Sequence, residues 1–299
     1  MADTIFDQDT AVRRIGELEF EAEIANQRWW VGRGPNGGFV AAILLRALTE
    51  ALGDPARPPR SLSIHYPSAP QIGKLAIAVT IERVGRTTAY LSARATQGED
   101  VVAVAVAAFS SAFPGADFQT ATMPEVPPPE EIEPLAVTGA PVFTHNFEYR
   151  FAIGGPPFQK AGHARNGGWL RLNDPQPLDG PLAAAYTDAW PPAIFWLLDD
   201  FAIVPTVDLT IHFREALPLT GPGADDPVLA VFDSSRGRDG LWDENGELWS
   251  RDGRLLVQSR QLAAHIPLPT RVARRRAAPT APARAPARAP RRRSSPGGR

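Results

Sequence analysis

The chain has 299 residues, of which 43% are hydrophobic and 21% are charged, a composition ordinary for a globular protein with a sizeable core. It contains no cysteine, which excludes disulfides and thiolate chemistry and is compatible with the reducing cytoplasm. The N-terminal residues lack the apolar core of a signal peptide, and the most apolar run, residues 39–45, is too short to span a membrane. We therefore expect a cytoplasmic protein without a membrane span.

The net charge of −2 is unevenly distributed. Residues 271–299 carry ten arginines and no acidic residue, so setting them aside leaves −12 for residues 1–270. Because this Ala/Pro/Arg-rich segment has almost nothing to bury, we expect residues 269–299 to form a disordered basic tail. A basic arm could bind nucleic acid, but no aromatic residue is interleaved for base stacking. We interpret the tail as a solvated extension and expect no nucleic-acid contact through it.

The first distinctive segment is GRGPNGGF, residues 32–39, which fits the dinucleotide-binding pattern G-x-G-x-x-G. That pattern requires alternating strands and crossover helices around it, and the following sequence does not provide them. Residues 39–52 are instead apolar nearly all round and end at Gly53, which predicts a long helix wrapped by other elements. Gly37 and Gly38 open this helix, where backbone N–H groups could bind a carbonyl oxygen or a phosphate. The alternative is a steric role in close packing.

An internal repeat predicts the architecture. SLSIHY at residues 61–66 and DLTIHF at 208–213 lie 147 residues apart, and both alternate apolar with polar residues as a half-buried strand does. Further strands joined by short turns follow each copy, ending at 101–109 and 255–263, which predicts antiparallel meanders. In the second half, residues 181–188 and 194–198 form a helical pair interrupted by two prolines. We expect two tandem α+β repeats, at 1–125 and 144–268, joined by a linker at 126–143, each with a long helix wrapped by an antiparallel sheet.

Five segments carry a resemblance to a known family. In chain order over roughly residues 25–266 they read GPNGGFVAAILLRAL, SLSIHYPSAP, AAYTDAW, PTVDLTIHF and SRDGRLLVQSRQL. They resemble the acyl-CoA thioesterase II group and its thioesterase-like relatives. The resemblance implies a double hotdog fold and an acyl-CoA or other acyl thioester as substrate, with no cofactor and no metal. Because hotdog sheets often pair with one another, a homodimer is a further expectation.

The resemblance also implies a catalytic trio of Asp188, Thr206 and Gln261, which bind and orient a water for attack on the thioester carbonyl. A carboxylate among apolar residues can act as general base, while a hydroxyl and an amide hold it and the water in place. Backbone N–H groups at a helix N-terminus, as at Gly37 and Gly38, would stabilise the oxyanion. Structural alternatives remain open: Asp188 shapes a helix break, Thr206 starts a strand, and Gln261 satisfies a buried partner.

The repeat provides an internal control. Sliding the second half onto the first places Gln261 opposite Ala107 and Thr206 opposite Pro59, so we expect one active site per chain, built on the second half. Two other functions stay open: a non-catalytic acyl-CoA- or lipid-binding protein of the same fold, and a hotdog enoyl-CoA hydratase or dehydratase. The hydratase chemistry would favour an Asp–His pair, and no histidine lies near Asp188 in the sequence. His65 and His212 occupy equivalent repeat positions, which favours structural roles over metal binding.

Overall fold

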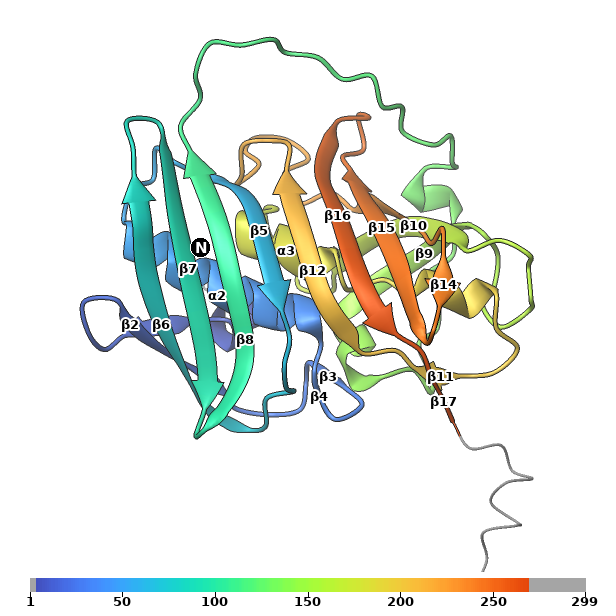
Figure 1. Cartoon of the computed structure of the whole chain (residues 1–299). Helices are drawn as coiled ribbons and strands as arrows, with labels where there is room; N and C mark the ends of the chain where they lie inside the picture. Colours follow the sequence, from blue (N-terminus) through green and yellow to red (C-terminus); the bar gives the residue numbers. More distant parts are fainter. Residues whose placement is uncertain (1–3, 269–299) are drawn as a thin grey trace, which may run out of the picture. The chain divides into compact units, whose positions relative to one another are not determined.

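A large antiparallel sheet with helices on one face dominates the computed structural model, which describes residues 4–268 (Figure 1). Its strands follow the order β1-β2-β6-β7-β8-β5-β12-β16-β15-β13-β10-β9, with β14 paired to β15. They span β1 Val12–Arg14, β2 Glu19–Ile24, β5 Pro59–His65, β6 Gly73–Val84, β7 Thr88–Gln97, β8 Asp100–Ser110, β9 Phe147–Ile153, β10 Arg165–Leu172, β12 Thr206–Phe213, β13 Val228–Asp233, β14 Gly237–Arg238, β15 Leu241–Trp249 and β16 Leu255–Ala264. The fold is α+β, as expected.

Shorter elements surround this sheet. Two small sheets pair β3 with β4 and β11 with β17. The remaining elements are α1 Ile5–Asp9, β3 Trp30–Val31, β4 Gly34–Pro35, α2 Gly37–Leu52, η1 Pro129–Glu131, η2 Val142–Asn146, α3 Gly180–Tyr186, η3 Ala193–Trp196, β11 Ala202–Ile203 and β17 Ile266–Pro267. The predicted basic tail at 269–299 lies outside the described residues, and the boundaries expected at 125, 143 and 268 stay a prediction.

Helix α2 is the long buried helix that the apolar run predicts. Asn36 caps its N-terminus by accepting the Phe39 N–H, and Gly53 ends it in the left-handed conformation at φ 62°. Ten of its residues are buried, because the helix lies against the sheet on one side and α3 on another (Figure 1). Such a helix is stabilised mainly by packing rather than by its own propensity.

The second half of the chain lacks the long helix that we expected in each repeat. Helix α3 has seven residues, and the chain continues through a turn into the four-residue η3. The prolines at 191 and 192 explain the break, since neither can donate a backbone N–H to a continuing helix. Strands β9 and β10 were not among the predicted elements either. In β10 the glycines at 167 and 168 interrupt the apolar pattern.

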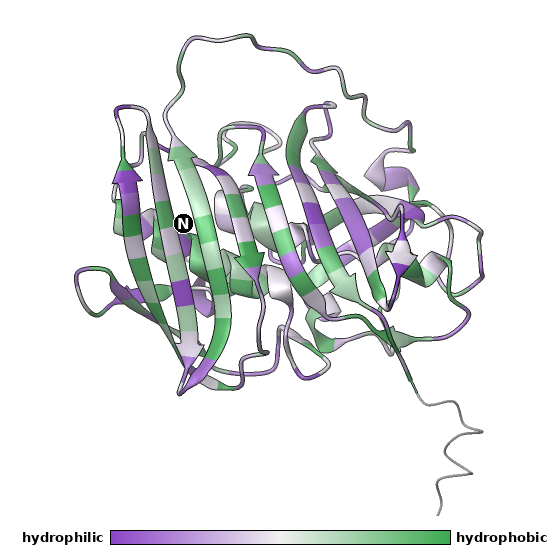
Figure 2. Cartoon of the chain, viewed as in Figure 1, coloured by the Kyte–Doolittle hydropathy of each residue, from purple (hydrophilic) through white to green (hydrophobic). Residues whose placement is uncertain are grey.

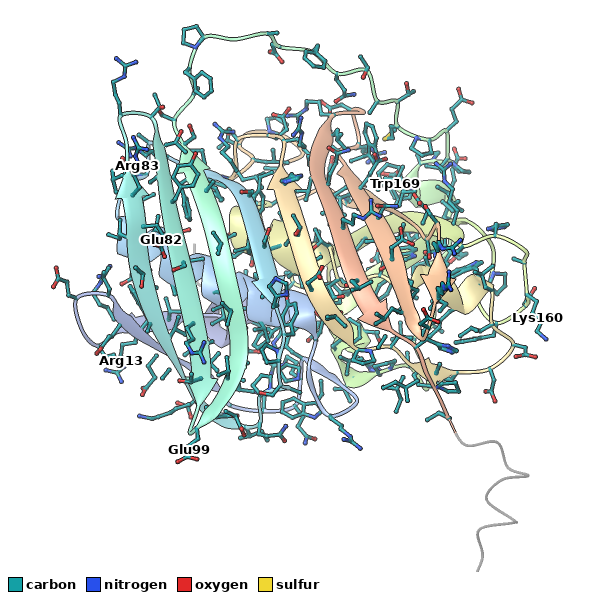
Figure 3. The ribbon with its side chains drawn as sticks, in the orientation of Figure 1. Arg13, Glu82, Arg83, Glu99, Lys160 and Trp169 are labelled. Atoms are coloured by element: carbon teal, nitrogen blue, oxygen red, sulfur yellow. The ribbon has the colours of Figure 1, made fainter. Side chains whose placement is uncertain are left out.

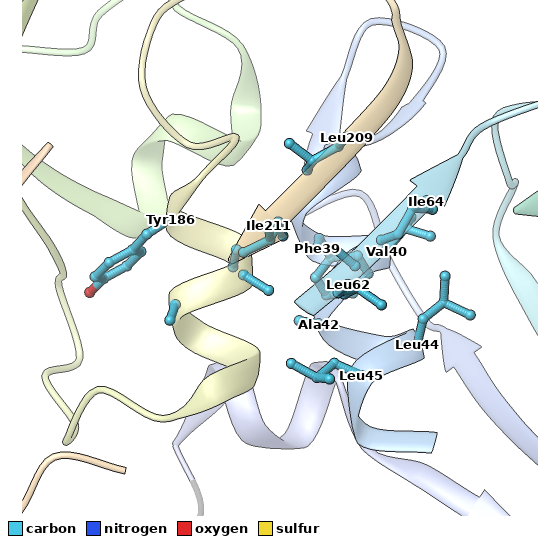
Figure 4. Packing of buried hydrophobic residues seen from close by; sticks show 14 of the residues in the cluster. Phe39, Val40, Ala42, Leu44, Leu45, Leu62, Ile64, Tyr186, Leu209 and Ile211 are labelled. Carbon is cyan, nitrogen blue, oxygen red and sulfur yellow. The ribbon is translucent and has the colours of Figure 1, made fainter. Parts of the chain in front are cut away.

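The two repeated strands lie side by side. Strand β5 pairs with β12 over five residue pairs, from Asp208 opposite His65 to His212 opposite Ser61, which joins both halves into one sheet. The strands show alternating hydrophobic and hydrophilic bands (Figure 2), and their apolar side chains pack on the helices (Figure 4). The side chains labelled there come from β5 (Leu62, Ile64), β12 (Leu209, Ile211), α2 (Phe39, Val40, Ala42, Leu44, Leu45) and α3 (Tyr186).

The strand registers confirm the internal alignment of the repeat. Leu62 of β5 lies opposite Ala107 of β8, and Leu209 of β12 lies opposite Gln261 of β16, so Ala107 and Gln261 occupy corresponding positions. Both strand pairs also shift register at their start, next to Pro59 in the first half and next to Thr206 in the second. The first half therefore has proline and alanine where the second half has threonine and glutamine.

Candidate active site

Asp188 lies where the end of α3 meets the start of α2. Its Oδ2 accepts hydrogen bonds from the Asn36 Nδ2 at 2.8 Å and from the Gly38 N–H at 3.0 Å. The same Asn36 nitrogen donates to the Asp188 backbone carbonyl at 2.7 Å. Asn36 is 6% exposed and also caps α2, so one side chain both begins the helix and orients the aspartate. The carboxylate thus faces the positive end of a 16-residue helix.

The glycine pair of the NGG segment makes this approach sterically feasible. A Cβ at Gly38 would lie 2.5 Å from the Ala185 carbonyl oxygen of α3, closer than such contacts allow. A Cβ at Gly37 would lie 3.0 Å from the Asp188 Oδ2. The steric role considered for these glycines is therefore present, while substrate binding by their N–H groups stays a prediction.

Burial raises the pKa of Asp188 to about 6, although the hydrogen bonds from Gly38, Gly37 and Asn36 act to lower it. The residue as a whole is half-buried, so solvent retains access to it. A carboxylate with this pKa is largely ionised at neutral pH and more basic than an exposed aspartate. It is therefore suited to accept a proton from water.

Thr206 and Gln261 form a hydrogen-bonded pair on neighbouring strands. The Thr206 Oγ1 donates to the Gln261 Oε1 at 3.1 Å. Gln261 is 6% exposed in β16, and Thr206 is half-buried at the first residue of β12. The strand register shifts between Thr206 and Asp208. Such a bulge changes the direction in which a neighbouring side chain points, here that of Thr206.

Glu244 of β15 is a site residue that the sequence analysis missed. It lies directly opposite Gln261, accepts the Gln261 Nε2 at 2.7 Å and accepts the Ala193 N–H at 2.5 Å. Most carboxylates, such as Glu82 and Glu99 in Figure 3, are exposed, whereas Glu244 is 5% exposed. Burial raises the pKa of Glu244 to about 8, and the nearby charges of Asp188 and Asp233 also raise it.

The structure thus joins two of the three predicted residues directly. Thr206 and Gln261 share a hydrogen bond, whereas Asp188 is hydrogen-bonded to Asn36 and Gly38. The charge of Asp188 also acts on Glu244, the hydrogen-bond partner of Gln261, and raises its pKa. Tyr66 completes the surroundings: its hydroxyl donates to the Gly37 carbonyl at 3.0 Å, and burial, followed by the Asp188 charge, raises the pKa of this phenol.

Two of the missed residues had a sequence signal. Asn36 precedes the apolar run by three residues, the position of an N-cap. Glu244 alternates in phase with Trp242 and Leu248, so the strand period places it on the buried face. A buried glutamate needs partners, and that need is itself an indication of a site. For Tyr66 the sequence held no comparable signal, because its contact with Gly37 depends on tertiary structure.

The next question is whether histidines or a possible metal site belong to this candidate site. In the part of the chain that the structure describes, no group of three or more His, Asp or Glu side chains is placed to hold a metal ion. His65 and His212 are exposed, and no described histidine hydrogen-bonds to Asp188. Among residues 4–268, no helix is long and apolar enough to cross a membrane.

Comparison with known proteins places this geometry in a family. Residues 26–110 match the acyl-CoA thioesterase N-terminal domain, and residues 119–265 match the acyl-CoA thioesterase C-terminal domain. The chain belongs to the acyl-CoA thioesterase family. Each half of the sheet thus corresponds to one of the two thioesterase domains, and the candidate site draws Asp188, Thr206, Gln261 and Glu244 from the C-terminal one.

Solved structures and a curated relative resemble this chain over most of its length. A conserved protein of unknown function with a hotdog fold from Alicyclobacillus acidocaldarius has a TM-score of 0.82 and 26% identity, covering 89% of this chain and 100% of its own. A protein from Thermobifida fusca proposed to be a thioesterase II has a TM-score of 0.74 and 26% identity, covering 89% and 98%. An uncharacterized protein of Mycobacterium tuberculosis is 26% identical over 279 residues, covering 82% of this chain and 90% of its own. The fold is of the hotdog type.

Proposed function

We propose that this protein hydrolyses an acyl-CoA or another acyl thioester to a free acid and a thiol, using a water activated by Asp188, Thr206 and Gln261. The observation that carries the proposal is the Asp188 carboxylate at the N-terminus of α2, whose pKa burial raises to about 6. Membership of the acyl-CoA thioesterase family supports the substrate class. A thioester is already activated, so a positioned base and a water suffice for its cleavage.

In the proposed reaction, Asp188 takes a proton from water while the water oxygen attacks the thioester carbonyl carbon. The tetrahedral intermediate then collapses, the carbon–sulfur bond breaks, and the leaving thiolate takes the proton from the Asp188 carboxylic acid. Thr206 and Gln261 hold the water so that its lone pair faces the carbonyl. Such positioning lowers the entropic part of the barrier, in addition to the gain from proton transfer.

Gly37 and Gly38 are the proposed contacts for the substrate carbonyl. Both lie at the N-terminus of α2, where backbone N–H groups and the helix dipole favour a developing negative charge. The Gly38 N–H donates to Asp188 at 3.0 Å, so a substrate oxygen would share this donor with the carboxylate. As Asp188 accepts a proton, its hold on that N–H weakens and the donor becomes more available to the oxyanion.

The architecture that we propose is a double hotdog whose second helix is reduced. Supporting observations are the corresponding positions of β5 with β12 and of β8 with β16, together with the register shift common to both halves. In this interpretation, α2 and the shorter α3 are the two central helices. A homodimer and a cytoplasmic location stay predictions, of which light scattering in solution tests the first.

A panel of acyl-CoAs of increasing chain length, assayed for thiol release with Ellman's reagent, tests the proposed activity. We expect turnover on at least one chain length and none on the free acid. A protein that binds acyl-CoA in calorimetry but releases no thiol from any of them would instead be a binding protein of the same fold. Hydration of an enoyl-CoA without thiol release would point to the hydratase alternative.

A further inference from the structure

A chain of hydrogen bonds runs from η3 through β15 and β16 to β12, and each link has a defined donor. The Ala193 N–H and the Gln261 Nε2 donate to the two different carboxyl oxygens of Glu244. The Gln261 Oε1 in turn accepts the Thr206 hydroxyl. Ala193 is fully buried, and Glu244 and Gln261 are nearly so, so water cannot readily replace either partner.

We propose that Glu244 is a positioning residue. It sets the donor-to-acceptor direction of these hydrogen bonds so that the Thr206 oxygen accepts a hydrogen bond from the attacking water. The inference rests on the proposed function, and it adds a residue to the site. Glu244 acts through Gln261 and does not touch the substrate itself.

The direction follows from the donors and acceptors available. A backbone N–H can only donate, and a carboxylate can only accept, so Glu244 requires that Gln261 present its NH₂ group. The Gln261 carbonyl is then turned toward Thr206, whose single hydroxyl hydrogen it receives. Thr206 is left with lone pairs only, and a water at this site must donate to it.

That direction matters for the chemistry. A water that donates one hydrogen to Asp188 and the other to Thr206 keeps a lone pair free to attack the carbonyl carbon. If the hydrogen bonds ran the other way, Thr206 would donate its hydrogen to the water, which would engage one of the two lone pairs of the water and leave one water hydrogen without its acceptor. The same side chains would then hold the water in a less favourable orientation for attack.

The first half of the sheet shows that the fold does not require this chain of hydrogen bonds. Leu91 of β7 lies opposite Ala107 and corresponds to Glu244, while Ala107 corresponds to Gln261 and Pro59 to Thr206. Leu91 is fully buried, so an apolar side chain fills the position without loss of the sheet. A buried carboxyl and its partners are costly compared with such packing. Their presence in the second half only, beside Asp188, is explained by a role in the reaction.

The protonation state of Glu244 also affects the direction of these hydrogen bonds. A protonated Glu244 carries an O–H that needs an acceptor, and Gln261 provides one by turning its carbonyl toward it, which reverses the chain. The charges of Asp188, in the turn after α3, and of Asp233, on β13 and hydrogen-bonded to Asn245, act on Glu244, while β16 and η3 contribute the uncharged Gln261 amide and the Ala193 N–H. We therefore expect the kcat of the wild type to rise as Glu244 loses its proton.

An exchange of the two side chains tests the inference. Glu244→Gln leaves one oxygen for the Ala193 N–H and presents an NH₂ group to Gln261, which reverses the chain; we expect kcat to fall about 10- to 100-fold with little change in KM. Gln261→Glu alone places two carboxyl groups face to face and is expected to be impaired as well. The double variant restores the direction, because the amide introduced at position 244 donates to the carboxylate introduced at position 261, and that carboxylate accepts the hydroxyl hydrogen of Thr206.

We expect the double variant to have a higher kcat than either single variant. The pH dependence of kcat that we assign to Glu244 should disappear in Glu244→Gln. Glu247→Gln is the matched control, since it makes the same change on the opposite face of β15 and should keep the wild-type kcat. Melting temperatures of all variants report on folding. A double variant no better than Glu244→Gln, with all proteins folded, overturns the inference while the proposed function stands. A wild type that releases no thiol overturns both.

Discussion

Asp188 reaches its raised pKa through two opposing influences. Burial disfavours the ionised form, whereas the Gly38 and Gly37 N–H groups and the Asn36 amide favour it, and burial is the larger effect. The hydrogen bonds alone would lower the pKa of Asp188 and make it a weaker base, whereas burial alone would raise the pKa further. The balance at about 6 leaves an ionised carboxylate that is still basic.

The pH dependence of activity is the first prediction at the scale of the residue. Because Asp188 must be ionised to accept a proton, kcat/KM should fall as the pH is lowered through about 6, by about tenfold for each further pH unit and in addition to the fall expected from protonation of Glu244. An aspartate with an ordinary pKa would add no such fall above about pH 4. A profile measured in buffers of constant ionic strength, flat to that limit, would contradict the role of Asp188 as a buried base.

Asp188→Asn provides a second prediction at this scale. Asparagine has nearly the same shape but cannot take a proton, so kcat/KM for thiol release should fall about 10²- to 10⁴-fold. Asp225→Asn serves as a control, since Asp225 is an exposed aspartate outside the proposed trio. Wild-type activity in Asp188→Asn would exclude the proposed mechanism.

Two elements meet at the glycine pair, and their approach positions the base. Helix α2 begins at Gly37, and the end of α3 passes so close to Gly38 that no side chain fits between them. The turn after α3 then places Asp188 at the α2 N-terminus and, five residues later, Ala193 against Glu244. The turn between α3 and η3 thus connects the base to the hydrogen-bonded chain.

Gly38→Ala is the corresponding prediction. The added methyl group would lie 2.5 Å from the Ala185 carbonyl oxygen, so α3 must move and carry Asp188 with it. We expect a loss of about 1–3 kcal/mol in the free energy of unfolding, as overpacking typically causes, and a lower kcat. Gly115→Ala is a suitable control, because a Cβ there meets nothing closer than 4.0 Å. Unchanged denaturation and unchanged kcat in Gly38→Ala would contradict the steric account.

Most of the fold and part of the site could be predicted from the sequence. The strands flanking the repeat and the helix at 37–52 follow from local periodicity and capping, which a sequence displays directly. The interruption of the second helical stretch by two prolines was predicted as well, but a second long helix is not confirmed, since α3 has seven residues and η3 four. Glu244 could not be paired with Gln261, because the partner of a strand residue depends on register, which is a tertiary property.

The whole molecule depends on the junction between its halves. Strand β5 pairs with β12, and the hydroxyls of Ser63 and Thr210 lie 3.1 Å apart across this junction. Apolar side chains of both strands pack against α2 and α3 on the inner face (Figure 4). Because α2 of the first half also supplies Asn36 and Gly38 to Asp188 of the second, the site needs both halves in place.

We predict that the two halves unfold together. Ile211 of β12 is fully buried at the junction, and Ile211→Ala should lower the free energy of unfolding by about 2–5 kcal/mol. Calorimetry should show a single transition at a lower temperature, and hydrogen exchange should report equal loss of protection in β7 and β15. Ile203→Ala is the control, since Ile203 is 46% exposed. Two separate transitions, of which only one shifts, would show that the halves are independent.

A single-turnover reaction in H₂¹⁸O tests the role of Asp188 most directly. If Asp188 acts as general base, the acid released in the first turnover carries one ¹⁸O from the solvent, and a peptide containing Asp188 stays unlabelled in mass spectrometry. An unlabelled acid together with ¹⁸O in Asp188 would show that the carboxylate attacks the thioester itself, and this result would contradict the account.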